Sequence, residues 1–275
     1  MEKIKTNSGF KKFRKILFRT IVGLILLLLL VSIALSLPFV QTKIAHYATD
    51  KINKDYGTHI NIEEVAITFF GGVKLKKVLV LDHHNDTLIY SNRIKTSILD
   101  FKKLLNGQLI FGDLSLDNFY LQIKNYKGEK ATSLDKFIAA FDDGTKSSGK
   151  FLMKSKNIYL TESRFVMLDY NRANPKDVDF TKLKAHLIDF QIKGPDVTTA
   201  INTMTFHDHR GVQVDNLAAN FTYTKKNIIL NKLLVTTKES FMIGNVVLKY
   251  NKDNHDFSDF NNRVKFDITD RKSVV

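Results

Sequence analysis

The sequence predicts a mostly β protein: a transmembrane helix, an amphipathic helix, and a long antiparallel β-sheet with one apolar face and one short inserted amphipathic helix. Three observations support this prediction. A run without charged side chains covers residues 20–40, and it is long enough to span a bilayer. Helical hydrophobic spacing changes to a period of two near residue 58. Only three prolines occur in 275 residues, so many uninterrupted strands can form.

The first 40 residues have the charge order of a membrane anchor. Residues 1–19 are a basic segment, and the run of residues 20–40 that follows covers a bilayer core of roughly 30 Å at about 1.5 Å per residue. A cleaved signal peptide, the alternative, has a shorter apolar core of about 7 to 15 residues. The orientation would be set by the basic residues Lys11, Lys12, Arg14, Lys15 and Arg19. We therefore expect a single-pass protein with a cytoplasmic amino terminus and its bulk outside the cytoplasm.

Composition excludes several classes of site. Cysteine is absent, which excludes disulfides, thiolate metal sites and cysteine nucleophiles. The formal net charge is +14, but seven of the 42 basic residues precede Thr20. The others are scattered, and in stretches such as VKLKKVLVL the lysines alternate with apolar residues, as on the solvated face of a strand. We expect no nucleic-acid partner, although attraction to anionic lipid headgroups stays open.

Helical spacing continues beyond the anchor into an amphipathic helix over residues 41–57. Gly57 ends it as a C-terminal stop signal. The apolar residues at helical spacing are Phe39, Val40, Ile44, Tyr47, Ala48, Ile52 and Tyr56.

Strand-like alternation covers residues 58–127 and again residues 151–275. Gly71-Gly72 is expected to form a hairpin turn. Residues 128–150 between the two parts contain a short amphipathic helix, with Ser133 as the expected N-cap, and a flexible linker. This helix either lies over the sheet or against lipid, or it closes one end of the core.

A unit of eight residues recurs along the strand regions: apolar, any, apolar, two non-apolar residues, apolar, any, apolar. It begins at Ile60, Val73, Leu114, Val178, Val212, Ile228 and Phe241, and an eighth copy from Ile158 departs from it only at Ser163. The central pair is expected to form a tight reversal or a β-bulge. In either geometry the apolar residues on both sides of the pair stay on one face of the sheet.

The apolar-face candidates come from six of these units. They are Ile60, Ile62, Val65, Ile67, Val73, Leu75, Val78, Val80, Leu114, Leu116, Phe119, Leu121, Val212, Val214, Leu217, Ile228, Leu230, Leu233, Val235, Phe241, Ile243, Val246 and Leu248.

No catalytic or metal-binding motif is evident. The histidine pairs in LDHHNDT (His83, His84 and Asp86) and TFHDHRG (His207 and His209) are expected in solvated loops, since neither has an evident third ligand. Nucleophile-elbow, P-loop and dinucleotide-binding patterns are absent. Neighbouring carboxylates such as Glu63 and Glu64 do not aim at a shared centre in a strand. We expect no enzyme, no catalytic residues, no metal and no cofactor.

The stretch LPFVQTKIAHYATDKINKDYGTHINIEEVAITFFGGVKLKKVLVLD resembles the amino-terminal part of TamB and the wider AsmA-like family of Gram-negative envelope proteins. In that family an anchor passes through a Pro-Val-Gln type junction into an amphipathic helix and then into strands with a glycine turn. The later stretch FGDLSLDNFYLQI is similar to the strand unit of the same family.

The resemblance implies an inner-membrane protein whose long, groove-like, taco-shaped sheet crosses the periplasm with its apolar face inward, as in chorein-like lipid bridges. It further implies phospholipid transport between the inner and outer membranes, or outer-membrane protein translocation and assembly with a TamA-like barrel partner. The apolar-face candidates would then line a groove for acyl chains.

Family members run much longer, so this chain, which stops at RKSVV, is expected to be a truncated or partial form that lacks the region meeting the barrel. Two alternatives stay open: an anchored structural or adhesive β-solenoid whose apolar face is a packed core, and an anchored enzyme.

Overall fold

The computed structural model describes residues 37–68, 72–99, 108–140, 152–193, 196–224, 226–249 and 264–272, with Lys103 and the positions 19, 20, 22–24, 26, 27, 30 and 33. Four predicted orientation determinants, Lys11, Lys12, Arg14 and Lys15, lie outside the described residues, as does much of the predicted anchor. So does the predicted linker after residue 140. Within the described part of the chain, no helix combines the length and the apolar character that crossing a membrane requires.

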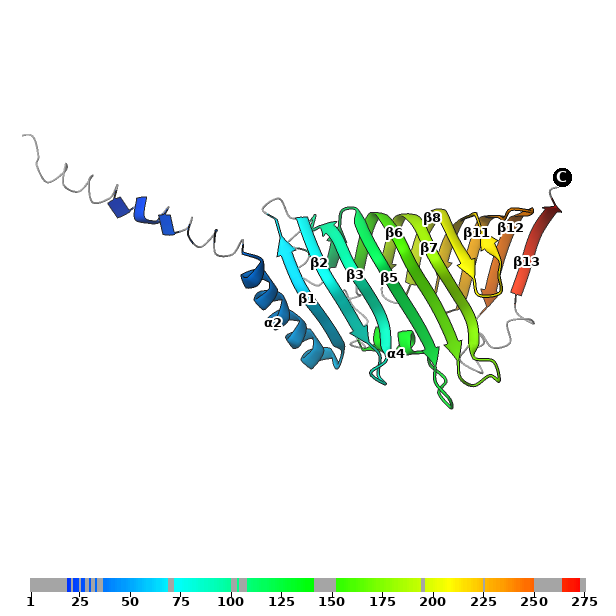
Figure 1. Ribbon diagram of the computed structural model, residues 1–275, viewed down its shortest axis with the longest axis horizontal. Helices are drawn as coiled ribbons and strands as arrows, with labels where there is room; N and C mark the ends of the chain where they lie inside the picture. Colours follow the sequence, from blue (N-terminus) through cyan, green and yellow to red (C-terminus); the bar gives the residue numbers. More distant parts are fainter. Residues whose placement is uncertain are drawn as a thin grey trace, which may run out of the picture.

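The protein is mostly β, as the alternating pattern predicted, and the described strands form one open sheet of 13 strands. The strands are β1 (His59–Ile67), β2 (Gly72–Leu81), β3 (Thr87–Ser97), β4 (Gln108–Phe111), β5 (Leu114–Asn125), β6 (Leu152–Asp169), β7 (Lys176–Lys193), β8 (Asp196–Asp208), β9 (Gln213–Val214), β10 (Asn216–Tyr223), β11 (Asn227–Thr236), β12 (Ser240–Lys249) and β13 (Val264–Lys272). They follow one another across the sheet in chain order, except that β4 pairs with β6 and β9 with β8 (Figure 1).

The expectation of a purely antiparallel sheet is wrong at one place. Strands β4 and β5 both run parallel to β6, so the sheet is mixed. The physical reason is the connection: parallel neighbours need a crossover of a dozen or more residues. Residues 126–151, which contain helix α4 (Ser133–Ala139), provide that connection.

Irregular positions inside strands explain the repeated unit. In five of its eight copies the second central residue has positive φ: Lys77, Asn118, Glu162, Lys182 and Lys232 lie between 46° and 52°. These residues lie inside strands and not at chain reversals, so the tight reversal is the wrong alternative at these five positions. At Glu162, Lys182 and Lys232 the strand pairing shifts register, as an inserted residue requires. At Lys77 and Asn118 the register with the antiparallel neighbours is unchanged, so there the two paired strands leave the regular alternation together.

Helix α4 begins one residue earlier than predicted. Its N-cap is Thr132, whose side chain accepts a hydrogen bond from the Asp135 backbone in a capping box. Ser133, the predicted N-cap, is instead fully buried. Its hydroxyl accepts a hydrogen bond from the backbone N–H of Lys124 at 2.9 Å, which attaches the helix to β5.

Helix α2 (Pro38–Tyr56) lies along the free edge of β1 (Figure 1). Polar side chains of the helix bond to the backbone of this edge. Gln41 donates to the Ile67 carbonyl at 2.8 Å and accepts from the Ile67 amide at 2.5 Å. Asn53 forms the same pair of bonds with Ile60, both at 2.8 Å. Side-chain amides thus replace a neighbouring strand, which protects the edge from pairing with another chain.

The two sides of α2 differ in character. The side of α2 against the sheet is polar, while Phe39 and Tyr47 are 65% and 75% exposed. The Lys43 ammonium lies 4.4 Å from the centre of the Phe39 ring. The outward side therefore combines aromatic and basic groups, which is typical of helices at a membrane surface.

Candidate functional site: the apolar face of the sheet

The inner face is defined here as the side of the sheet to which the apolar residues of the repeated unit point. Its first part joins β1 to β2, where Ile62 lies opposite Val78 and Val65 lies opposite Leu75. The other two cross-strand pairs on this face are Ile60 with Val80 and Ile67 with Val73. Each of the eight apolar-face candidates of these two strands therefore lies opposite another candidate.

The inner face continues through β3 into β5 and β6. Leu116 lies opposite Ile94 of β3 on one side and Leu160 of β6 on the other. Leu121 similarly lies between Ile89 and Phe165. The irregular positions of β5 and β6, Asn118 and Glu162, lie opposite each other in the parallel pair. The change from antiparallel to parallel pairing therefore does not interrupt the apolar surface.

An aromatic row crosses the middle of the inner face. Phe180 of β7 lies with its ring centre 4.0 Å from that of Phe206 in β8 and 6.0 Å from that of Phe165 in β6. Phe206 packs in a cluster with Leu183, Ala185 and the candidate residue Val214. The middle of the sheet is thus apolar at positions that the candidate set did not include, although Phe180, Leu183 and Ala185 belong to the unit that begins at Val178.

The same side extends across β10, β11 and β12. Leu217 lies opposite Val235, and Leu230 lies opposite Val246. Leu217 and Val235 contact both the cluster around Phe206 and a second cluster around Leu233, so the two clusters are continuous. Ile228 and Leu248, the last pair on this side, lie opposite each other.

Three candidates lie elsewhere. Val212 precedes β9 and is 48% exposed. Phe241 and Ile243 point away from the inner face, because β12 pairs with β13 without interruption from Ser240 to Leu248 and so has no bulge to reset its alternation. Ile243 is accordingly 49% exposed.

The neighbouring bulge explains why the Phe241 unit departs from the pattern. The extra residue lies on β11, where the backbone N–H of Lys232 donates to the Asn245 side chain at 3.0 Å. A single bulge on β11 is enough to accommodate the mismatch, so β12 keeps strict alternation. Its inner positions are therefore Met242, Gly244, Val246 and Leu248.

Most of the candidate side chains on the inner face are half-buried. Val65, Leu114 and Leu233 are less than a tenth exposed, whereas Ile67 is 38% exposed. The two described helices contact the sheet mainly along β1 and β5.

Buried serines interrupt the inner face at the bulges. Ser91, Ser155 and Ser163 are 0%, 3% and 2% exposed. Each hydroxyl donates to a backbone carbonyl two residues away in its own strand, at 3.2, 2.8 and 3.1 Å. A buried carbonyl without a partner is costly, so these hydroxyls stabilise the bulges. Ser163, the one departure from the repeat in its unit, thus has a local structural role that the apolar pattern could not reveal.

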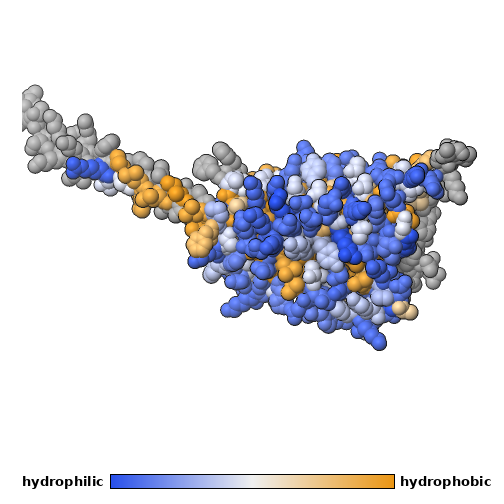
Figure 2. Space-filling model, viewed as in Figure 1, coloured by the Kyte–Doolittle hydropathy of each residue, from blue (hydrophilic) through white to orange (hydrophobic). Residues whose placement is uncertain are grey.

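The opposite side of the sheet, called the outer face, is polar. Figure 2 shows that the surface turned to the viewer over the strands is mostly hydrophilic, while apolar residues gather along the chain before α2. On the outer face Arg164 donates two hydrogen bonds to Asp179, both 2.8 Å long, and Lys176 donates a third at 3.1 Å. The Arg164 guanidinium holds the pKa of the buried Asp179 carboxyl at about 2, although burial opposes this shift.

The described side chains of the inner face form a surface suited to binding apolar groups. The surface is built from aliphatic and phenylalanine side chains, and its buried hydroxyls are already bonded to backbone carbonyls. Comparison of the sequence with protein-family models and with curated proteins found no match.

Proposed function

We propose that this chain is an inner-membrane-anchored periplasmic protein of envelope biogenesis, similar to TamB and AsmA-like proteins. In this proposal the inner face binds the acyl chains of phospholipids in transit between the inner and outer membranes. A role in the assembly of outer-membrane proteins with a barrel partner would require a further region of such a protein. The function resides in the surface and needs neither a catalytic residue nor a cofactor.

The observation that carries the proposal is the continuity of the inner face from β1 to β12. Apolar pairs follow one another strand by strand, and the irregular positions keep each strand in phase. Removing an acyl chain from water contributes about 0.8 kcal/mol per buried CH₂ group. A continuous apolar surface therefore stabilises a lipid tail at every step without the need for an energy source at each strand.

The amino-terminal elements support the same proposal. The described side chains of the apolar run are exposed: Leu24, Leu27 and Leu30 are 57%, 57% and 63% accessible. Such side chains are stable in lipid rather than water. Helix α2 connects this run directly to β1, so a lipid leaving the membrane would meet the first strand of the inner face.

A second candidate is an anchored structural or adhesive β-solenoid. The deep burial of Leu183 and Phe206, at 5% and 6% exposed, favours it, because a sealed core has this property. The two candidates differ in whether a lipid tail can enter between the side chains of the inner face.

Site-specific photo-crosslinking in the native membrane separates these candidates. A photoreactive residue at Ile62, Leu116 or Leu230 is expected to capture phospholipid, identified by mass spectrometry. The matched positions Lys74, Lys76 and Lys232, which are exposed, are expected to capture little. Equal labelling of both sets would contradict the lipid-binding proposal, and absence of lipid from both sets would favour the solenoid.

The location is tested independently of the lipid. A reporter enzyme fused after Tyr56 is expected to be active only outside the cytoplasm, because the basic flank of residues 1–19 stays inside. Cleavage between Ser36 and Leu37 in the mature protein would contradict the anchor.

A further inference from the structure

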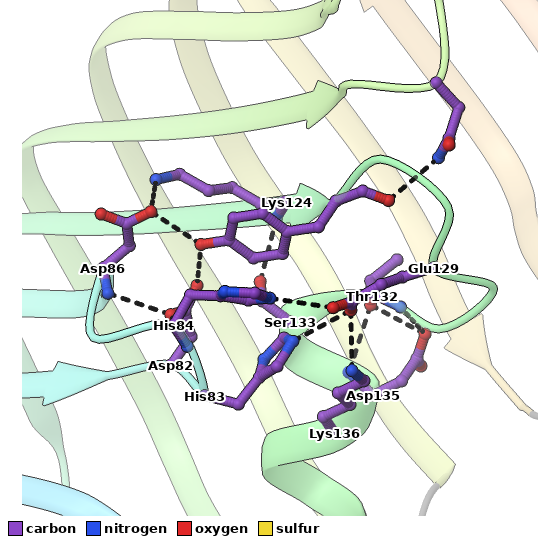
Figure 3. A network of polar contacts seen from close by, with 12 residues as sticks. Asp82, His83, His84, Asp86, Lys124, Glu129, Thr132, Ser133, Asp135 and Lys136 are labelled. Atoms are coloured by element: carbon purple, nitrogen blue, oxygen red, sulfur yellow. Dashed lines mark hydrogen bonds and ion pairs between the residues drawn. The ribbon is translucent and has the colours of Figure 1, made fainter.

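A cluster of two histidines and one glutamate lies at one end of the sheet, apart from the inner face. His83 and His84 belong to the turn between β2 and β3, and Glu129 belongs to the loop between β5 and α4. Because β3 runs antiparallel to β5, the start of β3 and the end of β5 lie at the same end of the sheet. Segments about 45 residues apart in the chain therefore converge, as Figure 3 shows.

The three side chains present their ligand atoms to one another. The Nε2 atom of His83 lies 2.9 Å from one carboxylate oxygen of Glu129, and that of His84 lies 2.8 Å from the other. The two imidazole nitrogens and the carboxylate all lie within 4.8 Å of one another. Two histidines with one carboxylate, leaving a fourth position open, are a frequent ligand set for Zn²⁺ in proteins.

The surrounding residues hold the histidine pair in place. The Asp82 carboxylate accepts the backbone N–H groups of His84 and Asp86, at 2.8 and 3.0 Å. The Tyr126 hydroxyl lies 2.7 Å from both the Asp82 and Asp86 carboxylates. The Tyr126 ring lies with its centre 4.0 Å from that of His84 and 5.4 Å from that of His83.

This framework does not involve Glu129, so the turn is ordered independently of the third ligand. The glutamate has its own support, since its backbone N–H closes a turn on the Tyr126 carbonyl at 3.0 Å. Partners of this kind, which orient the ligands without touching the metal, strengthen metal sites.

We propose that His83, His84 and Glu129 bind a divalent transition metal ion of the Zn²⁺ type, which fastens the β2–β3 turn to the loop that leads into α4. The carboxylate and both Nε2 atoms are the ligands, and each Nε2 carries no proton when the metal is bound. This proposal does not depend on lipid binding by the inner face.

Lys136 is the main competitor for the glutamate. Its ammonium group donates to Glu129 at 2.7 Å, so without metal the carboxylate already has three partners. The Lys136 side chain is 39% exposed and can turn toward water when a metal binds. The His84 side chain is 46% exposed, which leaves a path for the ion. Removing Lys136 should therefore strengthen Zn²⁺ binding at a metal site, whereas it should weaken a simple ion-pair cluster.

The test is titration of the purified full-length chain, in detergent and without a polyhistidine tag, with ZnCl₂ by calorimetry. One Zn²⁺ per chain is expected, and His84→Ala and Glu129→Gln should each weaken binding at least about tenfold. Lys136→Gln should strengthen binding. Circular dichroism of each variant confirms the fold. If Glu129→Gln unfolds, His84→Ala, which alters an exposed side chain, decides the question.

Two controls separate this site from adventitious binding. His207→Ala and His209→Ala alter the other histidine pair and should leave the affinity unchanged. Co²⁺ titration should add a visible absorption band that His84→Ala abolishes. Zn²⁺ affinity that is insensitive to His84→Ala and Glu129→Gln, or lowered equally by the control variants, would overturn the proposal. So would weaker binding in Lys136→Gln.

Discussion

Replacing Asn53 by alanine tests whether α2 acts as a substitute strand at the edge of β1. The Asn53 amide exchanges two hydrogen bonds with the Ile60 backbone and accepts a third from the hydroxyl of Thr58 at 3.0 Å. Each of these bonds contributes about 1 kcal/mol net. Alanine is the better helix former by roughly 0.5 kcal/mol. The expected loss is therefore about 2 to 3 kcal/mol for local opening at this end of the edge.

Amide hydrogen exchange of the full-length chain in detergent measures this loss directly. A loss of about 2 to 3 kcal/mol corresponds to roughly 30- to 150-fold faster exchange of the Ile60 amide. Amides within β6 and β7, in the interior of the sheet, should keep their exchange rates. The matched control is Lys51→Ala, which alters an exposed position of the same helix.

The result is decisive because the higher helix propensity of alanine and the loss of the three hydrogen bonds change stability in opposite directions. If Asn53 only faced solvent, the alanine variant would be slightly more stable and Ile60 would exchange no faster. Unchanged Ile60 exchange, or the same acceleration in Lys51→Ala, would refute the idea that side-chain amides replace a strand at this edge.

Three further outcomes are expected. Asp179→Asn should remove about 2 kcal/mol of stability at neutral pH, because the folded pKa of Asp179 is lowered from 3.8 to about 2 and the ionised carboxylate therefore stabilises the folded state at pH values above about 4. In acid titrations followed by circular dichroism, the wild type should lose this stabilisation as pH falls from about 4 to 2. An equal pH dependence in the variant would contradict this expectation. Lys182→Gly should raise the unfolding midpoint, because it relieves roughly 1 to 2 kcal/mol of left-handed strain at a φ of 51° against an entropic cost of roughly 0.5 to 1 kcal/mol for glycine in a strand. Lys182→Val should lower the midpoint. Phe119→Asp on the inner face should abolish complementation of an envelope defect while protease resistance stays near normal. The control Ile243→Asp on the outer face should have no effect. Degradation of the Phe119→Asp variant would indicate a sealed core.

The period-two alternation was sufficient to predict the β class and most of the inner face. Side chains on a strand point alternately to the two sides, so apolar spacing alone assigns residues such as Ile62 and Leu116 to one face. The non-apolar pair between the halves of each unit also predicted that the alternation is reset there. The pattern could not separate a reversal from a bulge, because both keep the flanking residues on one side. Positive φ at Lys182, together with the register shift between Thr181 and Lys184, decided for the bulge.

The error at Ile243 has a similar origin. Its unit satisfies the same spacing as the others, but a mismatch between two paired strands needs only one inserted residue. Which of the two strands carries the bulge depends on the pairing of β11 with β12, and this is a property of two segments together. One-dimensional spacing contains no information about it. The lipid-binding role of the inner face and the membrane location stay predictions.

The sequence by itself determined the local features: strand alternation, the helix that ends before Gly57, the short helix near Ser133, the hairpin near Gly72 and the absence of cysteine chemistry. Only the tertiary structure decided the features that depend on segments far apart in the chain. The parallel pairing of β5 with β6, the polar contact of α2 with β1, and the meeting of His83 and His84 with Glu129 all belong to this second group. The physical reason is that alternation and capping arise from neighbouring residues, whereas strand order and side-chain convergence arise from the packing of the whole sheet.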